Sequence, residues 1–489
     1  MKTTYGLILS AFALIISFSS CSSDPLDLVT TVTEGDFTIA LPSPPTTNGQ
    51  MNLTAQFTTQ NIFKGKSSKV LGYQSGSILG PTIVVNTGDV MSVNLQNNLT
   101  EPTNIHWHGL IVPANMDGHP EDVVQPGASF DYKFKVIQRG GLYWYHPHPD
   151  GYTAKQAFMG LAGAVIVRDA EEEKLNLPSG EFEVPLVIQD KRINTDYSLD
   201  YTPTMNDVMT GYMGQYITVN GVHAPYKGVK TTTYRFRVLN GSNSRIYNLG
   251  FSNGASFKVI GSDGGLLETA EAVSTLLLAP GERADILMDF SSYNIGTELF
   301  LMNNSFTGTS TQGKQKFNIL KFVVETKITT NFVTPLALST LDKIAANSAS
   351  KTRTFRISEM SMSGMSNMGN MGGMTMTGMH QINNKVYDKN RIDEVVAAGS
   401  TEIWVFDNST GAEPHPMHVH GVQFQVLDRT GGRGGLIASE KGWKDTILLL
   451  PGEKVRVIMT FNNNKGLFVL HCHNLEHEDD GMMLQFEVQ

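Results

Sequence analysis

Residues 471–482 read HCHNLEHEDDGM and concentrate potential metal ligands in a short stretch. Cys472 lies between two histidines, His477 follows five residues later, and Met482 follows five residues after that. A thiolate, two imidazoles and a weak axial thioether are the ligand set of a blue copper site. His415, in the segment HPMHVHG, can supply the second imidazole. The stretch therefore predicts a copper site, and its polar neighbours argue against an inert buried thiol at Cys472.

Most of the remaining histidines occur in pairs. Of the 13 histidines, eight form four His-x-His pairs, two early and two late in the chain: His106/His108, His146/His148, His418/His420 and His471/His473. On a β-strand, residues i and i+2 point to the same face, so each pair presents two imidazoles side by side. Eight imidazoles are enough for a cluster of three copper ions, provided that the first and last domains meet face to face. The pairs predict such a cluster.

The position of Cys472 connects the two predicted sites. If residues 471–473 form a strand, the Cys472 side chain points away from His471 and His473. The thiolate then binds one copper ion, while the two neighbouring imidazoles reach the other metal group. We therefore expect Cys472 to be a short covalent connection between the sites.

Length and composition favour a large β-rich protein. The chain has 489 residues, which suggests about three domains. It contains 47 Gly and 20 Pro, and its short β-branched runs alternate with turn signals, which favours strands over helices. Two similar Pro-Gly turns, at 279–283 and 450–454, indicate duplicated β-sandwich domains. Cys21 and Cys472 are the only cysteines, which excludes a disulfide framework.

The N-terminal segment is predicted to be an export signal. A lysine precedes an apolar run at 6–18 that is too short to span a bilayer. Two serines then lead to Cys21, a pattern that resembles a bacterial lipobox. We expect a signal peptide at 1–20, a lipoprotein tether at 21–50 that anchors the protein to a membrane through Cys21, and a location in the periplasm or cell envelope. An ordinary signal peptide with an incidental cysteine is the alternative.

Taken together, the motifs resemble those of the multicopper oxidase family. HWHG, YWYHPH, HPMHVHG and HCHNLEHEDDGMM occur in the family's order between about Gly80 and Met483. The connecting segments PLVIQD, DGGLL, APGERAD and GWKDT also resemble the family's. Among its branches, bacterial periplasmic cuprous oxidases and bacterial laccases are the most similar. The resemblance implies an all-β fold of three cupredoxin-like Greek-key β-sandwich domains, placed at 51–172, 173–335 and 336–489.

The resemblance also implies four copper ions. Family members oxidise a substrate one electron at a time at a type 1 copper and reduce dioxygen to water at a cluster of one type 2 and two type 3 coppers. By position, the implied ligands are His415, Cys472, His477 and axial Met482 for type 1; His106 and His418 for type 2; and His108, His146 and His473 with His148, His420 and His471 for the two type 3 ions.

Two acidic residues are candidate proton donors, since the reduction of dioxygen to water consumes protons. Asp117 lies eleven residues after His106, where cuprous oxidases have an acid near the cluster. Glu478 adjoins His477 and matches a second such acid. The resemblance therefore implies catalytic roles for Asp117 and Glu478 beside Cys472. A turn aspartate and a solvated surface glutamate are the alternatives.

A Met-rich segment at 360–379 bears on the identity of the substrate. It holds eight of the 22 methionines, and its glycines argue against a stable helix. Thioethers are soft ligands suited to Cu(I), and the segment resembles the Met-rich insert that covers the type 1 site of cuprous oxidases. An insert without a role is the alternative. The predicted ligands of a substrate copper in this segment are Met360, Met362, Met365 and Met368.

The sequence departs from the cuprous oxidases just before HPMHVHG. Those enzymes have an Asp and a Met four and two residues before the first His of this motif, whereas this chain has Gly411 and Glu413. Glu413 is predicted to substitute as a hard ligand for the substrate copper. Glu359 is the acid nearest to the Met-rich segment, and His380, directly after it, is a candidate additional ligand.

The favoured function is oxygen-dependent oxidation of Cu(I) in copper tolerance. The alternatives are a laccase-like oxidase of phenols or aromatic amines and, in another class, a non-catalytic copper-binding or scaffold protein. Scaffold relatives have lost copper ligands, whereas this chain retains every ligand position. The net charge of -9 and the lack of a large basic patch argue against a nucleic-acid partner. Because one chain carries all the ligands, we expect a monomer.

Overall fold

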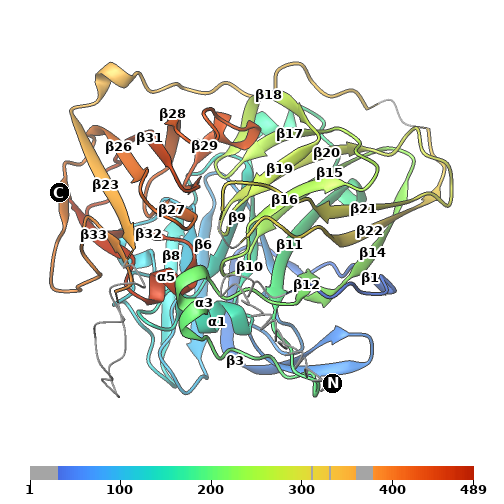
Figure 1. Ribbon diagram of the computed structural model, residues 1–489, viewed down its shortest axis with the longest axis horizontal. Helices are drawn as coiled ribbons and strands as arrows, with labels where there is room; N and C mark the ends of the chain where they lie inside the picture. The colour runs from blue at the N-terminus through green and yellow to red at the C-terminus, as the bar shows by residue number, and fades with distance from the viewer. Residues whose placement is uncertain (1–30, 310–311, 330–331, 360–377) are drawn as a thin grey trace, which may run out of the picture.

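The computed structural model describes residues 31–309, 312–329, 332–359 and 378–489. Strands of these residues form six sheets, which pack in pairs as three β-sandwich domains (Figure 1). This arrangement confirms the prediction of an all-β fold with three cupredoxin-like β-sandwich domains. Within the described ranges, no helix has the length and apolarity needed to cross a membrane.

The first sandwich closes around an apolar core that includes Leu95, Trp107 and Val165. Its two sheets have the strand orders β4-β3-β6-β8 and β2-β5-β10-β9-β7. Their strands are β2 (Thr46–Thr47), β3 (Gln50–Phe63), β4 (Lys66–Gly72), β5 (Thr82–Asn86), β6 (Val90–Asn97), β7 (His106–His108), β8 (Ser129–Lys135), β9 (Gly141–His146) and β10 (Gly163–Arg168).

The middle sandwich has the largest of the apolar cores, which includes Phe236, Leu278 and Phe322. Its sheets have the orders β13-β12-β11-β15-β20-β17-β18 and β1-β14-β22-β21-β16-β19. Their strands are β1 (Ile39–Ala40), β11 (Glu183–Lys191), β12 (Tyr216–Val219), β13 (Val222–His223), β14 (Pro225–Lys230), β15 (Thr233–Asn240), β16 (Tyr247–Phe251), β17 (Phe257–Ser262), β18 (Gly265–Val273), β19 (Thr275–Leu278), β20 (Arg283–Asp289), β21 (Glu298–Asn303) and β22 (Phe317–Thr326).

The third sandwich encloses Trp404, Cys472 and Phe486 in its core. Its sheets have the orders β24-β23-β26-β31-β28-β29 and β25-β33-β32-β27-β30. Their strands are β23 (Lys351–Glu359), β24 (His380–Ile382), β25 (Glu394–Val396), β26 (Thr401–Asn408), β27 (His415–Val419), β28 (Phe424–Thr430), β29 (Trp443–Lys444), β30 (Thr446–Leu449), β31 (Glu453–Thr460), β32 (Gly466–Cys472) and β33 (Met483–Val488).

Two short strands fall inside the segment predicted as a tether. β1 pairs in parallel with β14 of the middle domain, and β2 pairs in parallel with β5 of the first domain. Backbone pairing therefore attaches the second half of this segment to two domains, which a reading of it as an extended tether did not foresee. Residues 21–30, with Cys21, lie outside the described residues.

Three short helices meet where the domains join. The helices of the described chain are α1 (Thr153–Met159), α2 (Ala170–Glu173), α3 (Met205–Thr210) and α5 (Leu475–Asp479), with 3-10 turns η1 (Ala114–Met116), η2 (Gly180–Phe182), η3 (Ala346–Ser348) and η4 (Ala438–Lys441). α1, α3 and α5 lie together near the centre of the molecule (Figure 1). The Asp479 carboxylate of α5 accepts the N–H groups of Thr153 (3.2 Å) and Ala154 (2.9 Å), which begin α1. These contacts fix the position of α5, which carries His477.

Strand register places the histidine pairs opposite one another. β7 and β9 are antiparallel neighbours, with His106 opposite His146. β27 and β32 are antiparallel neighbours, with His418 opposite His471. Because directly opposed residues on neighbouring strands point to the same face, each strand pair gathers imidazoles on one side of its sheet.

Candidate metal centre

The eight paired histidines form one buried cluster between the first and third domains. Each of these side chains is at most 1% exposed. The rings of His106 and His420 stack with centroids 3.7 Å apart, and those of His108 and His418 stack at 3.8 Å. Each stack pairs one ring from β7 with one ring from the β27 region. The structure therefore brings the two ends of the chain face to face, as the pairs predicted.

Ring nitrogens in the cluster face one another rather than a protein acceptor. His106 Nε2 lies 3.3 Å from His418 Nε2, and His471 Nε2 lies 3.1 Å from both His148 Nε2 and His420 Nε2. Two nitrogens that share one first-row metal ion at a tetrahedral angle lie roughly 3.4 Å apart. His471 Nδ1 donates to the Cys472 carbonyl at 3.0 Å, and His420 Nδ1 lies 2.7 Å from the Asp117 carboxylate. The Nε2 atoms of both rings therefore carry lone pairs that face one another, and a shared cation satisfies them.

Other nitrogens of the cluster are buried without a hydrogen-bond partner among the described residues. They are His108 Nδ1, His146 Nε2 and both ring nitrogens of His473. The centroid of the His473 ring lies 4.9 Å from that of His108 and 5.4 Å from that of His146. Orphaned imidazole nitrogens at this density fit a group of bound copper ions, because imidazole is a preferred copper ligand.

Burial also keeps these imidazoles in the protonation state that a metal requires. Burial is the largest cause that lowers the pKa of every candidate histidine ligand below its ordinary value, and it brings the pKa of His146 to about 3 and that of His471 to about 4. Neutral imidazole is the ligand form. The cluster is therefore ready to bind metal at neutral pH without first losing protons.

A second group lies behind the cluster, around Cys472. The Cys472 Sγ atom lies 3.5 Å from His415 Nδ1 and 3.7 Å from His477 Nδ1, and the two Nδ1 atoms are 3.3 Å apart. Met482 is fully buried, and its carbonyl accepts the Cys472 N–H at 3.1 Å. One thiol and two imidazoles grouped in this way, with Met482 in the same apolar core, fit the ligand set of a blue copper site. His471 and His473, on either side of Cys472, belong to the other cluster.

His415 and His477 each have a second ring nitrogen, Nε2, which lies beside a hydrogen-bond acceptor. His415 Nε2 lies 3.1 Å from the Glu359 carboxylate. His477 Nε2 lies 3.2 Å from the carbonyl of Met209, in helix α3 of the middle domain. These contacts place the proton on Nε2 and leave Nδ1 of each ring facing Cys472.

The two candidate acids contact the eight-histidine cluster through different residues. Asp117 is fully buried; its Oδ2 lies 2.7 Å from His420 Nδ1, and its carbonyl accepts His106 Nδ1–H at 2.8 Å. Glu478 is also buried, 3.3 Å from His471 Nδ1 and 3.5 Å from His148 Nδ1. Burial raises the pKa of both carboxyls. The alternative readings, a turn aspartate and a solvated glutamate, do not match this burial.

A third carboxylate at the cluster was missed by the sequence analysis. The Asp445 Oδ1 atom lies 2.9 Å from His108 Nε2, and the Asp445 carbonyl accepts His418 Nδ1–H at 2.8 Å. Asp445 lies in GWKDT, one of the connecting segments that resembled the family's. The likeness of GWKDT to the family was a signal in the sequence, but no feature of that segment indicates a contact with His108, 337 residues earlier in the chain.

The predicted substrate-copper residues have different outcomes. Met360, Met362, Met365 and Met368 lie outside the described residues. Glu413 is buried, and its N–H donates to Glu359 at 3.0 Å. Its role as a hard ligand stays a prediction.

The missing acid at position 411 has a structural explanation. A Cβ built on Gly411 would clash with Asn408 Oδ1 and would lie 3.1 Å from Glu359 Oε1. The position therefore has no room for a side chain, and Glu359 lies beside it. Glu359 also accepts the N–H of Ala412 at 3.1–3.2 Å. The carboxylate that contacts His415 therefore comes from β23, not from the segment before HPMHVHG.

His380 packs against the group formed by His415, Cys472 and His477. Its ring is fully buried and stacks on His477, with centroids 3.7 Å apart. Neither of its nitrogens has a hydrogen-bond partner in the part of the chain that the structure describes. His380 thus joins the surroundings of the candidate copper site rather than the surface.

Comparisons with known proteins agree with this geometry. Three family models, each described as multicopper oxidase, match residues 54–172, 183–326 and 359–489. The chain is similar to a multicopper oxidase of Staphylococcus haemolyticus, with 36% identity over 90% of this chain and 89% of that protein. It is also similar to a laccase of Bacillus subtilis, with 34% identity over 86% of this chain and 90% of the laccase.

Solved structures give the same result. The multicopper oxidase McoA of Aquifex aeolicus superposes with a TM-score of 0.83 at 34% identity, covering 94% of this chain and all of McoA (100%). A multicopper oxidase of Campylobacter jejuni described as a metallo-oxidase superposes with a TM-score of 0.81 at 30% identity, covering 95% of this chain and 98% of that one.

Proposed function

The chain belongs to the multicopper oxidase family, whose members are copper-dependent oxidoreductases with dioxygen as acceptor, and we propose that it oxidises Cu(I) in copper tolerance. The observation that carries the proposal is the Glu359 carboxylate on His415. A laccase-like activity on phenols or aromatic amines is the second candidate, favoured by the similarity to a laccase. We further propose that the protein is exported, anchored through Cys21, and monomeric.

The proposal assigns four copper ions to the buried groups. When bound, copper supplies the one-electron oxidation of the substrate and the reduction of dioxygen to water. The side chains hold the ions, exclude water and connect the two groups through Cys472. The proposed ligands are His415, Cys472, His477 and Met482 for type 1; His106 and His418 for type 2; and His108, His146, His473, His148, His420 and His471 for the type 3 pair.

Burial of the type 1 position supports a small ionic substrate. His415 and His477 are fully buried, so an organic ring cannot stack on the surface of either imidazole. The Glu359 side chain is 12% exposed and contacts His415 directly. Glu359 therefore offers a carboxylate oxygen between solvent and the type 1 ligand, and in sequence it immediately precedes the Met-rich segment.

The charge of Glu359 suits this role. Burial acts to raise the pKa of Glu359, but the contacts with His415 and with the N–H groups of Glu413 and Ala412 outweigh burial and lower the pKa to about 2. The carboxylate is thus ionised throughout the neutral range. An anionic oxygen beside soft thioethers attracts a copper cation and disfavours a neutral phenol.

A Glu359→Gln substitution is expected to lower the rate of Cu(I)-dependent oxygen uptake about 10- to 100-fold, because it removes a charge but keeps the oxygen that accepts hydrogen bonds. Oxygen uptake with an aromatic amine should change less than threefold. The comparison variant is Glu413→Gln, because Glu413, two residues before His415, is the other predicted substrate carboxylate. A larger loss in the Glu413 variant would move the substrate role to Glu413, and equal rates for wild type and both variants would contradict a substrate carboxylate.

Replacing the seven methionines between 360 and 376 by serine is expected to raise the apparent KM for Cu(I) about tenfold, which equals about 1.4 kcal/mol of lost binding. Serine keeps the length of the segment but removes its soft ligands. The measurement is oxygen uptake at varied Cu(I) and at varied phenol. An unchanged KM for Cu(I) with a lower KM for phenol would favour the laccase-like function.

A further inference from the structure

A buried charge network connects the middle domain to the histidine cluster. Its central residue, Arg283, begins β20 and is fully buried. The Arg283 guanidinium donates to both carboxylate oxygens of Asp445, at 2.7 and 2.6 Å. Its remaining N–H groups donate to the carbonyls of Leu142 (3.0 Å), Gly281 (2.9 Å) and Asp263 (3.0 Å). Every guanidinium N–H is therefore used, and the planar fork is fixed in one orientation.

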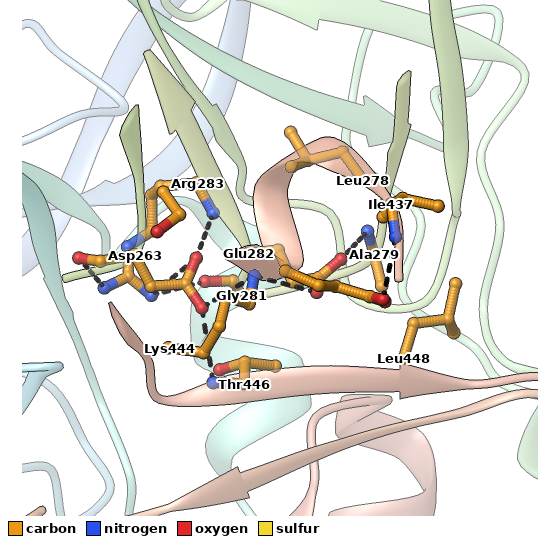
Figure 2. A network of polar contacts seen from close by, with 12 residues as sticks. Asp263, Leu278, Ala279, Gly281, Glu282, Arg283, Ile437, Lys444, Thr446 and Leu448 are labelled. Atoms are coloured by element: carbon orange, nitrogen blue, oxygen red, sulfur yellow. Dashed lines mark hydrogen bonds and ion pairs between the residues drawn. The ribbon is translucent and has the colours of Figure 1, made fainter. Parts of the chain in front are cut away.

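A second cation closes the network from the third domain. The Lys444 ammonium pairs with Asp263 at 2.9 Å and with Glu282 at 3.0 Å (Figure 2). Asp263 also accepts the Arg283 N–H at 2.8 Å. Asp263, Glu282 and Arg283 belong to the middle domain, whereas Lys444 and Asp445 belong to the third, and each is at most 1% exposed. These buried ion pairs therefore hold the two domains in a defined position relative to one another.

Asp445 connects these ion pairs to two candidate copper ligands through hydrogen bonds. Its Oδ1 atom accepts His108 Nε2–H, and its carbonyl accepts His418 Nδ1–H. The opposite nitrogens of these rings then carry lone pairs that face the cluster: His108 Nδ1, which has no hydrogen-bond partner within the described ranges, and His418 Nε2, which faces His106. A carboxylate partner fixes both the tautomer and the ring orientation of a metal-binding histidine.

We infer that Arg283 and Asp445 act as a positioning pair, through which the middle domain sets the orientation of His108 and His418 for copper binding. All proposed ligands of the four copper ions lie at 106–148 or 415–482, so this pair gives the middle domain a role in the cluster without supplying a ligand. The inference rests on the proposed ligand roles of His108 and His418. Without Arg283, the Asp445 carboxylate would lose its two fixed donors and could rotate away from His108.

The test compares Arg283→Met with a matched control, Arg237→Met. Arg237 lies on β15, next to β20, is equally buried, and pairs with Glu172 (2.7 Å) and Asp285 (3.1 Å), away from the histidine cluster. Both variants remove one buried cation from the middle domain. The purified holoproteins are compared by copper content, by competition with a chelator, by the spectra of the type 2 and coupled type 3 coppers, and by the visible absorption of the copper–thiolate site. Thermal unfolding of the copper-free proteins reports stability separately.

We expect Arg283→Met to lower the copper affinity of the cluster about 10- to 100-fold while the copper–thiolate absorption stays unchanged. Asp445→Asn should do the same, because asparagine cannot accept the bidentate guanidinium, and Arg283→Lys should recover part of the affinity. Arg237→Met should lower only the unfolding temperature. Full cluster spectra in both Arg283→Met and Asp445→Asn would overturn the inference, and so would losses equal to those of Arg237→Met. Absence of cluster copper in the wild-type protein would instead contradict the proposed function.

Discussion

A Cys472→Ser variant is expected to lose substrate-driven oxygen uptake by at least about 1,000-fold. The Cys472 side chain lies beside His415 and His477, the proposed type 1 ligands, whereas its neighbours in sequence, His471 and His473, point into the histidine cluster. Serine supplies a hard, protonated oxygen in place of a soft thiolate, so it neither retains the type 1 copper nor provides the same path for electrons. Copper content should fall by one ion per chain, and the copper–thiolate absorption should disappear.

Stability is the competing explanation for such a loss. Cys472 is fully buried in the apolar core of the third domain, and a serine hydroxyl there costs about 1–3 kcal/mol if it lacks a partner. The Asn474 N–H, 3.4 Å from Sγ, offers one donor to the replacement. Thermal unfolding therefore accompanies the activity measurement. A folded Cys472→Ser protein that still consumes oxygen with Cu(I) would contradict the role of Cys472 as the connection between the sites.

Met482→Leu provides the matched control. Leucine has a similar volume and keeps the core filled, but it removes the axial thioether. The potential of a blue copper site is tuned by its axial ligand, so this variant should shift the type 1 potential and keep both the thiolate absorption and oxygen uptake. If Met482→Leu only shifts the type 1 potential while Cys472→Ser loses the copper, the loss at position 472 comes from the missing thiolate and not from altered packing of the core.

The grouping of the candidate copper ligands could be predicted from sequence because their chemistry and their spacing coincide. A His-x-His pair on a strand needs only the period of two to place both rings on one face, and the opposition of His106 to His146 follows from simple antiparallel pairing.

The two similar Pro-Gly turns, at 279–283 and 450–454, also share the same hydrogen bond. In each, the glutamate accepts the N–H of the residue three positions earlier, Ala279 at 2.8 Å and Leu450 at 2.9 Å.

The residues that hold these ligands could not be predicted in the same way. Glu359 contacts His415 across 56 residues, because β23 ends beside the segment that contains Gly411. The family's pattern has an acid four residues before His415, where this chain has Gly411, whereas the fold supplies the carboxylate from another strand. Asp445 and Arg283 meet across a domain interface, 162 residues apart. Such contacts depend on the packing of whole domains, which no local pattern encodes.

Asp117→Asn and Glu478→Gln are expected to lower the rate of dioxygen reduction about 100- to 10,000-fold each. Both acids are buried against cluster histidines, and burial raises the pKa of each, which favours a carboxyl group that can hold a proton near neutral pH. The amide variants cannot hold or release that proton. Anaerobic reduction of the type 1 site by substrate should stay as fast as in the wild type, because the two carboxyl groups lie on His420, His148 and His471 rather than on the rings of His415 and His477.

The amide substitution separates proton transfer from ligand orientation. Asparagine at 117 retains an oxygen that can accept the His420 Nδ1–H, whereas Asp117→Ala removes that acceptor as well as the proton. If Asp117 supplies protons, Asp117→Asn should keep its copper and lose turnover, and the exposed neighbour Asp122→Asn should change neither. If Asp117 only orients His420, Asp117→Asn should turn over normally and Asp117→Ala should lose cluster copper. Stopped-flow reoxidation of the fully reduced protein by dioxygen distinguishes the two, because that step consumes the protons and follows every contribution of the substrate site.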